Sequence, residues 1–185
     1  MMQYNLIDAM PPSLIWEPQW PVAAIIIGLL IAQRLGELVY AKRNTKALLA
    51  RGAQEYGRSH YPLMVAIHTA FLAALVYETL PNWPIIWPLA ILFLVLQAMR
   101  LWVLATLGPY WTTRIISSPD FPRISSGPFR FIPHPNYLVV TLEIATIPLI
   151  FGHVWISVIF SLLNAAILFV RIRIEADILT ERQAG

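Results

Sequence analysis

Five long apolar segments dominate the chain, and most polar residues fall between them. The segments cover roughly residues 21–41, 61–80, 84–107, 135–151 and 154–173. A membrane-spanning helix needs about 20 predominantly apolar residues, and about 17 is the lower limit. The pattern therefore predicts about five transmembrane helices, of which the fourth is the shortest.

The last two segments are separated only by Gly152 and His153. So short a connection predicts a tight helical hairpin, in which Pro148 would bend the first arm. No internal repeat and no low-complexity linker interrupts the chain. We therefore expect a single domain over residues 1–185, an all-α integral membrane bundle.

Composition agrees with a membrane location. Hydrophobic residues make up 58% of the 185 residues and charged residues 12%, whereas a soluble domain carries about 25% charged residues. The formal net charge of +3 is modest, and we expect no nucleic-acid partner. The chain contains no cysteine, which excludes disulfides, thiolate metal sites and cysteine nucleophiles. No two histidines have the spacing of metal ligands, so we expect no metal.

Among the connections between the segments, only alternate ones contain lysine or arginine. The N-terminal lead-in and the turns at residues 81–83 and 152–153 contain none. Five crossings place these two groups of connections on opposite sides of the membrane, and the positive-inside rule then predicts an outside N-terminus and a cytoplasmic C-terminus. The cations of the remaining connections are Lys42, Arg43, Lys46, Arg51, Arg58, Arg114, Arg123, Arg130, Arg171, Arg173 and Arg182.

Several ionisable residues lie within the apolar segments, where a charge at the bilayer centre costs about 2.5–3.5 kcal/mol. Arg34 and Glu37 are three residues apart and can pair on one helix face. We expect a structural ion pair near the cytoplasmic end, with a direct role in a site as the alternative. His68 is expected to be a packing residue rather than a ligand. Glu78 and Arg100 lie near segment ends, where long side chains can reach the interface.

A polar stripe runs along the fifth segment, because its polar residues recur at steps of three, four or seven. A solvated helix end would explain the C-terminal part of the stripe. It explains less well a stripe that continues through Asn164 among large apolar residues. We therefore favour an inner surface that faces water or a ligand. The stripe consists of Ser157, Ser161, Asn164, Arg171 and Glu175.

The fourth segment contains a second costly residue. Glu143 lies deep in it, on the same face as Asn136. A buried carboxylate needs a hydrogen-bond donor, and Arg171 or Arg173 of the adjoining helix could supply one.

The stretch GPFRFIPHPNY, residues 127–137, leads into this segment and is called the gateway below. Its prolines exclude a helix before Pro135, which itself suits a first helical turn. His134 would then stand at a helix mouth beside free backbone N–H groups, with Tyr137 one turn further in. Such a mouth can receive a ligand carboxylate. A stiff re-entrant loop that binds nothing is the alternative.

The gateway, Glu143 and the sequence RIRIEADIL at residues 171–179 together resemble the isoprenylcysteine carboxyl methyltransferase family of integral-membrane enzymes. The family pattern is roughly G-P-Y-R-x-x-R-H-P-x-Y, a glutamate inside the next helix, and R-x-x-x-E-E-x-x-L after the last helix. RLGELVYAKRN at 34–44, GAQEYGRSHYP at 52–62 and WTTRII at 111–116 are similar to a bacterial subgroup that often accompanies type III polyketide synthases.

The resemblance implies a bundle of about five transmembrane helices in the bacterial inner membrane. It also implies an O-methyltransferase that uses S-adenosylmethionine as its methyl donor. The acceptor would be a lipophilic small molecule or membrane lipid, namely a carboxylate, phenol or hydroxypyrone with a long alkyl chain. His134, Pro135, Tyr137 and Glu143 would form or help to form the donor's binding pocket.

The resemblance implies that Arg171 and Glu175 lie where donor and acceptor meet, and we hypothesise that Arg171, Arg173 and Glu175 are catalytic. Arg171 or Arg173 would orient the acceptor's oxygen anion, and Glu175 would position the acceptor or accept its proton. The chain departs from the family pattern at two positions: Pro133 stands in place of an arginine, and Ala176 stands in place of the second glutamate.

If the missing arginine neutralises a charge, Arg114 or Arg130 must take over that role. Two other functions stay open as alternatives. One is a membrane NADPH-dependent reductase of the sterol-reductase type, and the other is a non-enzymatic transport or scaffold protein.

Overall fold

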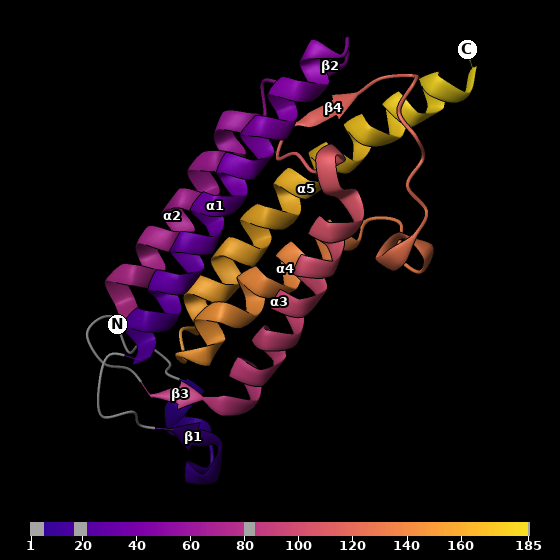
Figure 1. Cartoon of the computed structure of the whole chain (residues 1–185). Coiled ribbons are helices and arrows are strands. Elements are labelled where there is room, and N and C mark those ends of the chain that lie inside the picture. Colours follow the sequence, from indigo (N-terminus) through magenta and orange to yellow (C-terminus); the bar gives the residue numbers. More distant parts are fainter. Residues whose placement is uncertain (1–5, 17–21, 80–83, 185) are drawn as a thin grey trace.

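The structure, a computed structural model, describes residues 6–16, 22–79 and 84–184, with side chains up to Ile178 in the last helix. Five helices in this part of the chain run roughly along one axis and form a bundle (Figure 1). The predicted all-α membrane bundle is thereby confirmed. The helices are α1 (Val22–Ala50), α2 (Tyr61–Thr79), α3 (Trp87–Leu107), α4 (Pro135–Ile150) and α5 (Val154–Ala184).

Four of these helices, α1, α2, α3 and α5, are long and apolar enough to cross a membrane by length and composition, and α4 is a shorter apolar helix. The outward faces agree with a lipid environment, because large apolar side chains such as Leu29, Leu94 and Leu162 are about two-thirds exposed. Water-facing helices would carry polar side chains there.

Two helices extend beyond their predicted ends. Helix α1 continues from residue 41 to Ala50, so Lys42, Arg43 and Lys46 lie on a helix and not in a loop. Residues 42–50 contain several good helix formers, and apolar span length alone does not reveal a helix that projects from a bilayer. Helix α5 likewise continues past residue 173 to Ala184. The predicted segment ends at 21 and 80 and the turn at 81–83 lie outside the described residues.

Short elements gather at the two ends of the bundle. Strand β1 (Ile15–Trp16) pairs with β3 (Ile85–Ile86) at one end, and β2 (Gln54–Tyr56) pairs with β4 (Ile115–Ser117) at the other. The C-terminal part of α5 lies at the β2–β4 end (Figure 1). The connections after α1 and α3, both rich in cations, therefore share one end of the bundle. The remaining elements are short 3-10 helices, η1 (Leu6–Ala9), η2 (Pro12–Leu14), η3 (Gly108–Tyr110) and η4 (Gly127–Arg130).

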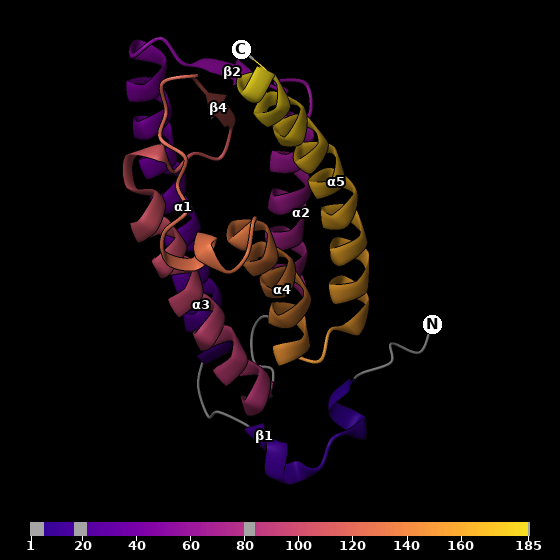
Figure 2. The same ribbon diagram turned by 90° about the vertical axis from the view of Figure 1, so that its right-hand side faces the viewer.

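Helices α4 and α5 form the predicted tight hairpin. Gly152 adopts a φ of 81°, which costs a residue without a Cβ little, and the backbone N–H of His153 donates to the carbonyl oxygen of Pro148 at 2.9 Å. Helix α4 lies in the middle of the bundle and packs most extensively against α3 and α5 (Figure 2). Its N-terminal end therefore points toward the β2–β4 end of the molecule.

The main apolar core lies nearer the β1–β3 end. It is built from α1, α2, α4 and β3, and it seals that end of the bundle. Its buried members include Ile27, Leu30, Phe71, Ile144 and Ile147. The charged residues Arg34 and Glu37 of α1, Arg100 of α3 and Arg171 of α5 lie between this core and the β2–β4 end.

Candidate functional site

The gateway is docked onto α3 through a glycine. Gly127 adopts a φ of 56°, and a Cβ at this position would lie 2.5 Å from Thr106 Oγ1 of α3. A larger residue would therefore force the gateway away from α3. The docked segment then turns through η4 and reaches His134, the residue before α4.

At the mouth of α4, the side chains of His134, Tyr137 of α4 and Glu175 of α5 meet. The Tyr137 hydroxyl donates a short hydrogen bond to Glu175 Oε1 of α5. The imidazole of His134 stacks on the Tyr137 ring with a centroid distance of 5.3 Å, and its Nδ1 lies 3.7 Å from Glu175 Oε2. Pro135 is buried as the first residue of α4, where its missing N–H leaves no bond unmade. We call His134, Tyr137, Arg171 and Glu175 the mouth cluster.

Arg171 of α5 completes the mouth cluster and is almost fully buried. Its Nε donates to the Tyr137 hydroxyl at 3.3 Å, and its Nη1 donates to the carbonyl oxygen of Thr113 at 2.9 Å. Nη2 lies 3.8 Å from Glu175 Oε1, which is a loose ion pair. The guanidinium is thus held in place largely by neutral groups, and part of its charge remains available to a ligand.

The β2–β4 ribbon and the residues beside it cover this end of the site. The Tyr61 hydroxyl lies 3.1 Å from Thr113 Oγ1, and Arg114 lies 4.4 Å over the Tyr61 ring. Arg114 Nη1 also donates to Glu55 Oε1 of β2 at 2.6 Å. That hydrogen bond raises the pKa of the Arg114 guanidinium above its usual range. The ribbon therefore fixes Thr113, which in turn positions Arg171.

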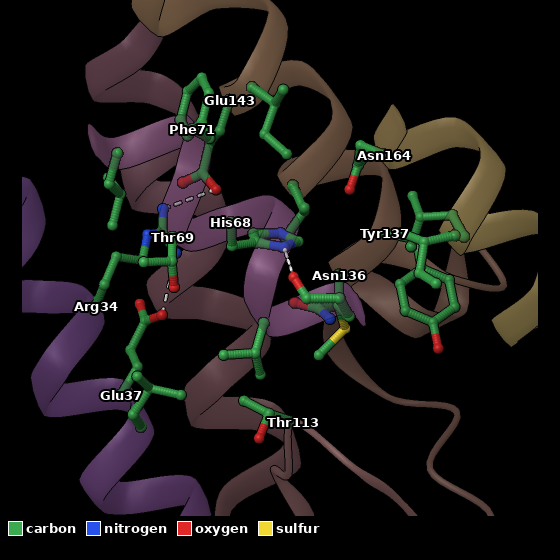
Figure 3. A pocket seen from close by; sticks show the side chains of 18 of the residues that line it. Arg34, Glu37, His68, Thr69, Phe71, Thr113, Asn136, Tyr137, Glu143 and Asn164 are labelled. Carbon is green, nitrogen blue, oxygen red and sulfur yellow. Dashed lines mark hydrogen bonds and ion pairs between the residues drawn. The ribbon is translucent and has the colours of Figure 1, made fainter. Parts of the chain in front are cut away.

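Two cavities meet at the mouth cluster. The outer cavity, about 250 Å³, lies beside η3 and β4 and is lined by His134, Arg114 and Glu175 among others. The inner cavity, about 210 Å³, lies among the five helices and is lined by His68, Glu143 and a large apolar surface (Figure 3). The residues that line both cavities are Trp111, Thr112, Asn136, Tyr137 and Arg171.

A closed ion cluster forms one wall of the inner cavity. Arg100 donates to both carboxylate oxygens of Glu37, and its Nη1 lies 3.0 Å from Glu143 Oε2. Arg34 lies 3.0 Å from Glu37 Oε2 and 2.9 Å from Glu143 Oε2, and Gln97 donates to Glu143 at 2.8 Å. We call Arg34, Glu37, Arg100 and Glu143 the buried ion cluster.

This cluster corrects two expectations. The donors to Glu143 are Arg34, Arg100 and Gln97, not Arg171 or Arg173, because the face of α4 that carries Glu143 is turned toward α1 and α3. Arg100 does not extend to the interface, because it is buried within the bundle between two carboxylates. Periodicity within a single helix could not reveal either pairing, since each joins residues of different helices.

Several buried polar atoms along the cavities have no hydrogen-bond partner among the described residues. Trp111 Nε1 and Asn136 Oδ1 are two of them, and both residues line the two cavities. Asn164 Oδ1 is a third, and it lines the inner cavity. Buried polar groups are nearly always satisfied in folded proteins. These three atoms therefore offer hydrogen-bonding positions to a polar ligand or to a buried water molecule.

The structure brings together most, but not all, of the predicted site residues. His134, Tyr137, Arg171 and Glu175 form the mouth cluster, and Glu143 shares the inner cavity with Tyr137 and Arg171. Pro135 is buried at the first position of α4 and lines neither cavity.

Arg173 lines neither cavity; it is exposed, and its guanidinium lies 4.3 Å over the Phe169 ring. Of the two arginines expected to replace the one lost at Pro133, Arg114 lines the outer cavity, whereas Arg130 is exposed and lines neither. The predicted polar stripe of α5 is also divided. Asn164 and Arg171 face the inner cavity, but the Ser157 hydroxyl donates to the carbonyl oxygen of Ala145 and serves packing.

Two contributors were missed by sequence reasoning. Trp111 and Thr113 belong to a connection that shows no periodicity, and only their position in WTTRII marked them. Within the described part of the chain, no group of three or more His, Asp or Glu side chains is arranged to hold a metal ion.

One family model and two relatives match the chain. The sequence model of the isoprenylcysteine carboxyl methyltransferase (ICMT) family matches residues 89–181. The uncharacterized protein YpbQ of Bacillus subtilis is 39% identical over 161 residues, which cover 85% of this chain and 96% of that protein. An uncharacterized protein of Haemophilus influenzae is 32% identical over 120 residues, covering 62% of this chain and 69% of that protein.

No solved structure matches the chain. Neither relative's name refers to a polyketide synthase, so an association with such enzymes stays a prediction.

Proposed function

Because this chain belongs to the isoprenylcysteine carboxyl methyltransferase family, we propose that it uses S-adenosylmethionine to O-methylate a lipophilic acceptor. Family membership and the four long apolar helices indicate a membrane methyltransferase. The proposal adds the donor, the class of acceptor and the roles of the residues. One observation carries it: two cavities of different polarity share a single wall formed by Tyr137, Arg171 and their neighbours.

The outer cavity suits the donor. S-adenosylmethionine carries a sulfonium, an ammonium and a carboxylate, and the cavity wall offers Glu175 for a cation and Arg114 for an anion. Trp111 Nε1, buried without a partner among the described residues, offers a further donor. When bound, S-adenosylmethionine would supply a methyl group already activated on sulfur, so the protein's main tasks are alignment and control of charge.

The inner cavity suits a lipophilic acceptor. Its lining is largely apolar, and two of its residues, Leu38 of α1 and Val65 of α2, are more than 40% exposed on the outside of the bundle. An alkyl chain could therefore enter from the bilayer between α1 and α2. The opposite end of the cavity is closed by Phe71 and Ile147, which belong to the buried core.

We assign different roles to the residues of the shared wall and to those beside it in the outer cavity. Arg171, which lines both cavities, would hold the acceptor's oxygen where negative charge develops. Glu175, whose carboxylate accepts the hydrogen bond of Tyr137, would take up the proton of a hydroxyl acceptor. His134 and Tyr137 would shape the donor's pocket, and Pro135 would set the start of α4.

We assign Glu143 an indirect role in binding the donor. Its carboxylate is already occupied by two arginines and Gln97, so it would position α4 and not contact the donor directly. Arg173 is left out of the proposed site because it lines neither cavity.

We also propose the orientation and location of the molecule. The β2–β4 end would face the cytoplasm, since it carries the cationic connections and a water-soluble donor must reach the outer cavity. In a bacterium this membrane would be the inner membrane, with the N-terminus outside and the C-terminus in the cytoplasm.

Binding of radiolabelled S-adenosylmethionine to the detergent-purified full chain tests the proposal. We expect saturable binding that falls at least about tenfold in Glu175→Gln, because a charge-assisted contact is lost. The matched control is Asp177→Asn, an exposed carboxylate two residues further along α5 that lines neither cavity.

Two outcomes would contradict the proposal. Binding of NADPH in place of S-adenosylmethionine would favour a reductase, and binding of neither ligand would favour a transport or scaffold protein.

A further inference from the structure

His68 of α2 is a titratable side chain in the inner cavity that the proposed chemistry does not use. It lines this cavity together with Asn136 and Asn164 (Figure 3). Its Nδ1 lies 2.8 Å from the carbonyl oxygen of Met64. A carbonyl oxygen can only accept a hydrogen bond, so Nδ1 must carry a hydrogen. In the neutral ring, Nε2 is then a bare acceptor.

No hydrogen bond is made by Nε2 to any of the described residues. The ring is therefore fixed in one tautomer by its own helix and presents an acceptor atom to the cavity. A packing histidine would have both nitrogens satisfied or buried in apolar contacts. This arrangement is instead typical of a group that awaits a donor.

The buried ion cluster brings no net charge to the wall of the inner cavity. Each guanidinium of the buried ion cluster contacts both carboxylates, and two arginines face two glutamates. The cluster is therefore neutral as a whole. A carboxylate oxygen placed against His68 Nε2 would meet a lone pair and no donor, so the two atoms would repel each other.

A second observation points to the same kind of ligand. Asn164 is completely buried, and its Nδ2 makes only a long contact of 3.4 Å with Thr141 Oγ1. Its Oδ1 has no partner among the described residues, and neither has Asn136 Oδ1. The inner cavity thus presents three acceptor atoms, and a ligand made only of hydrocarbon would leave all three unsatisfied.

We propose that the inner cavity binds a neutral amphiphile whose headgroup carries an O–H or N–H donor, and that His68 Nε2 accepts this hydrogen bond. The headgroup lies between His68 and the wall formed by Tyr137 and Arg171, and the chain leaves between Leu38 and Val65. That this amphiphile is the methyl acceptor rests on the proposed function. The proposal excludes carboxylates and plain hydrocarbon chains as preferred ligands.

The test uses three probes of equal chain length with the purified full chain in lipid nanodiscs: para-dodecylphenol, its methyl ether, and dodecanoic acid. Binding is measured without S-adenosylmethionine, by the concentration of probe needed to raise the unfolding temperature. Binding of radiolabelled S-adenosylmethionine is measured separately on every variant. We expect the phenol to bind about tenfold more tightly than the ether or the acid, as one satisfied buried acceptor predicts.

His68→Phe should remove this preference while binding of S-adenosylmethionine is unchanged. His68→Gln, which retains an acceptor, should keep part of the preference, and it also serves if the phenylalanine variant does not fold. His153→Phe, the same change in the turn between α4 and α5, should keep all of it, because His153 lines neither cavity.

Equal binding of the three probes, or a preference that persists in His68→Phe, would overturn the inference. Loss of S-adenosylmethionine binding in both His68 variants would assign His68 to the donor's site, which also overturns the inference but leaves the methyltransferase proposal standing. Failure of the wild-type protein to bind S-adenosylmethionine would instead contradict the proposed function.

Discussion

Two arginine–glutamate groups lie within this bundle, and they differ in how much bonding capacity they retain. In the buried ion cluster, Arg34 and Arg100 are each shared between Glu37 and Glu143. In the mouth cluster, Arg171 is bonded mainly to neutral oxygens and meets Glu175 only at 3.8 Å. The first group is saturated, whereas the second retains charge that a ligand can use.

The difference separates a structural role from a functional one. Charges in a bilayer must be paired or must face a cavity. The buried ion cluster follows the first rule, and it ties α1, α3 and α4 together. The mouth cluster follows the second, because it borders both cavities. Variants of the two arginines should therefore fail in different ways.

The largest effect is expected for Arg100→Ala. The change would leave two carboxylates buried with one guanidinium, and removal of one partner from a buried ion pair costs about 3–5 kcal/mol. Most of the protein should then fail to fold, as measured by folded yield and thermal unfolding in mild detergent. Arg173→Ala, a change at an exposed site, should lie within about 0.5 kcal/mol of wild type. If Arg100→Ala is as stable as wild type, the buried ion cluster is not structural.

Arg171→Ala should show the opposite behaviour. We expect methyl transfer to fall by about two to three orders of magnitude, as is typical when one group that stabilises developing negative charge is removed. Folded yield should be retained, because the lost contacts are mostly to neutral groups. The rate of label transfer from S-adenosylmethionine to a lipid extract is the measurement, with Arg173→Ala again as control. Full activity in Arg171→Ala would remove this residue from the site.

A milder effect is expected at the opening between α1 and α2. Val65→Trp should narrow the opening and slow transfer to a long-chain acceptor by roughly tenfold, equivalent to about 1.4 kcal/mol. Binding of S-adenosylmethionine should not change. Leu63→Trp is the matched control, since Leu63 is an exposed residue of the same helix that lines neither cavity. Equal rates in the two variants would place the acceptor's path elsewhere.

The smallest expected effect is a change in how protein stability depends on pH, and it involves His60 and Arg171. Burial, and to a lesser degree the positive charge of Arg171, lowers the pKa of His60 below its ordinary value of 6.5. The folded protein therefore binds this proton less readily than the unfolded chain does. The stability that His60 contributes is present in full above pH 6.5 and is lost as the pH falls below that value.

Thermal unfolding measured above and below pH 6.5 tests this loss of stability. Wild type should lose more stability on acidification than His60→Asn, by less than about 3 °C in unfolding temperature. The difference between the two should shrink when Arg171 is also replaced by alanine. An unchanged difference would mean that burial alone lowers the pKa of His60, without a contribution from Arg171.

Much of the fold follows from the sequence, because apolar span length and cation placement respond directly to the bilayer. The helix ends do not follow, and Lys42 and Lys46 show why. A helix that continues out of the membrane becomes polar, and span length cannot distinguish it from a loop. The hairpin at Gly152 was predictable because a connection of about two residues between two helices requires them to pack side by side in opposite directions.

The candidate site was predictable in part for a similar reason. His134, Tyr137, Arg171 and Glu175 are costly to bury, and their types and spacing could be read along the chain. The partners of Glu143 could not be read, because Arg34 and Arg100 come from other helices and meet it only through tertiary packing. The same holds for Thr113, whose role is to supply a carbonyl oxygen that any residue could provide.

The most direct test of a donor and an acceptor meeting at Arg171 is methyl transfer by the purified protein. Labelled S-adenosylmethionine is mixed with a lipid extract from cells that lack the protein, and the lipid products are analysed by mass spectrometry. We predict a labelled lipophilic product that gains one methyl group in place of hydrogen with wild type, and almost none with Arg171→Ala. Wild-type protein that binds the donor but methylates no lipid, or Arg171→Ala protein that methylates it at the wild-type rate, would contradict the account.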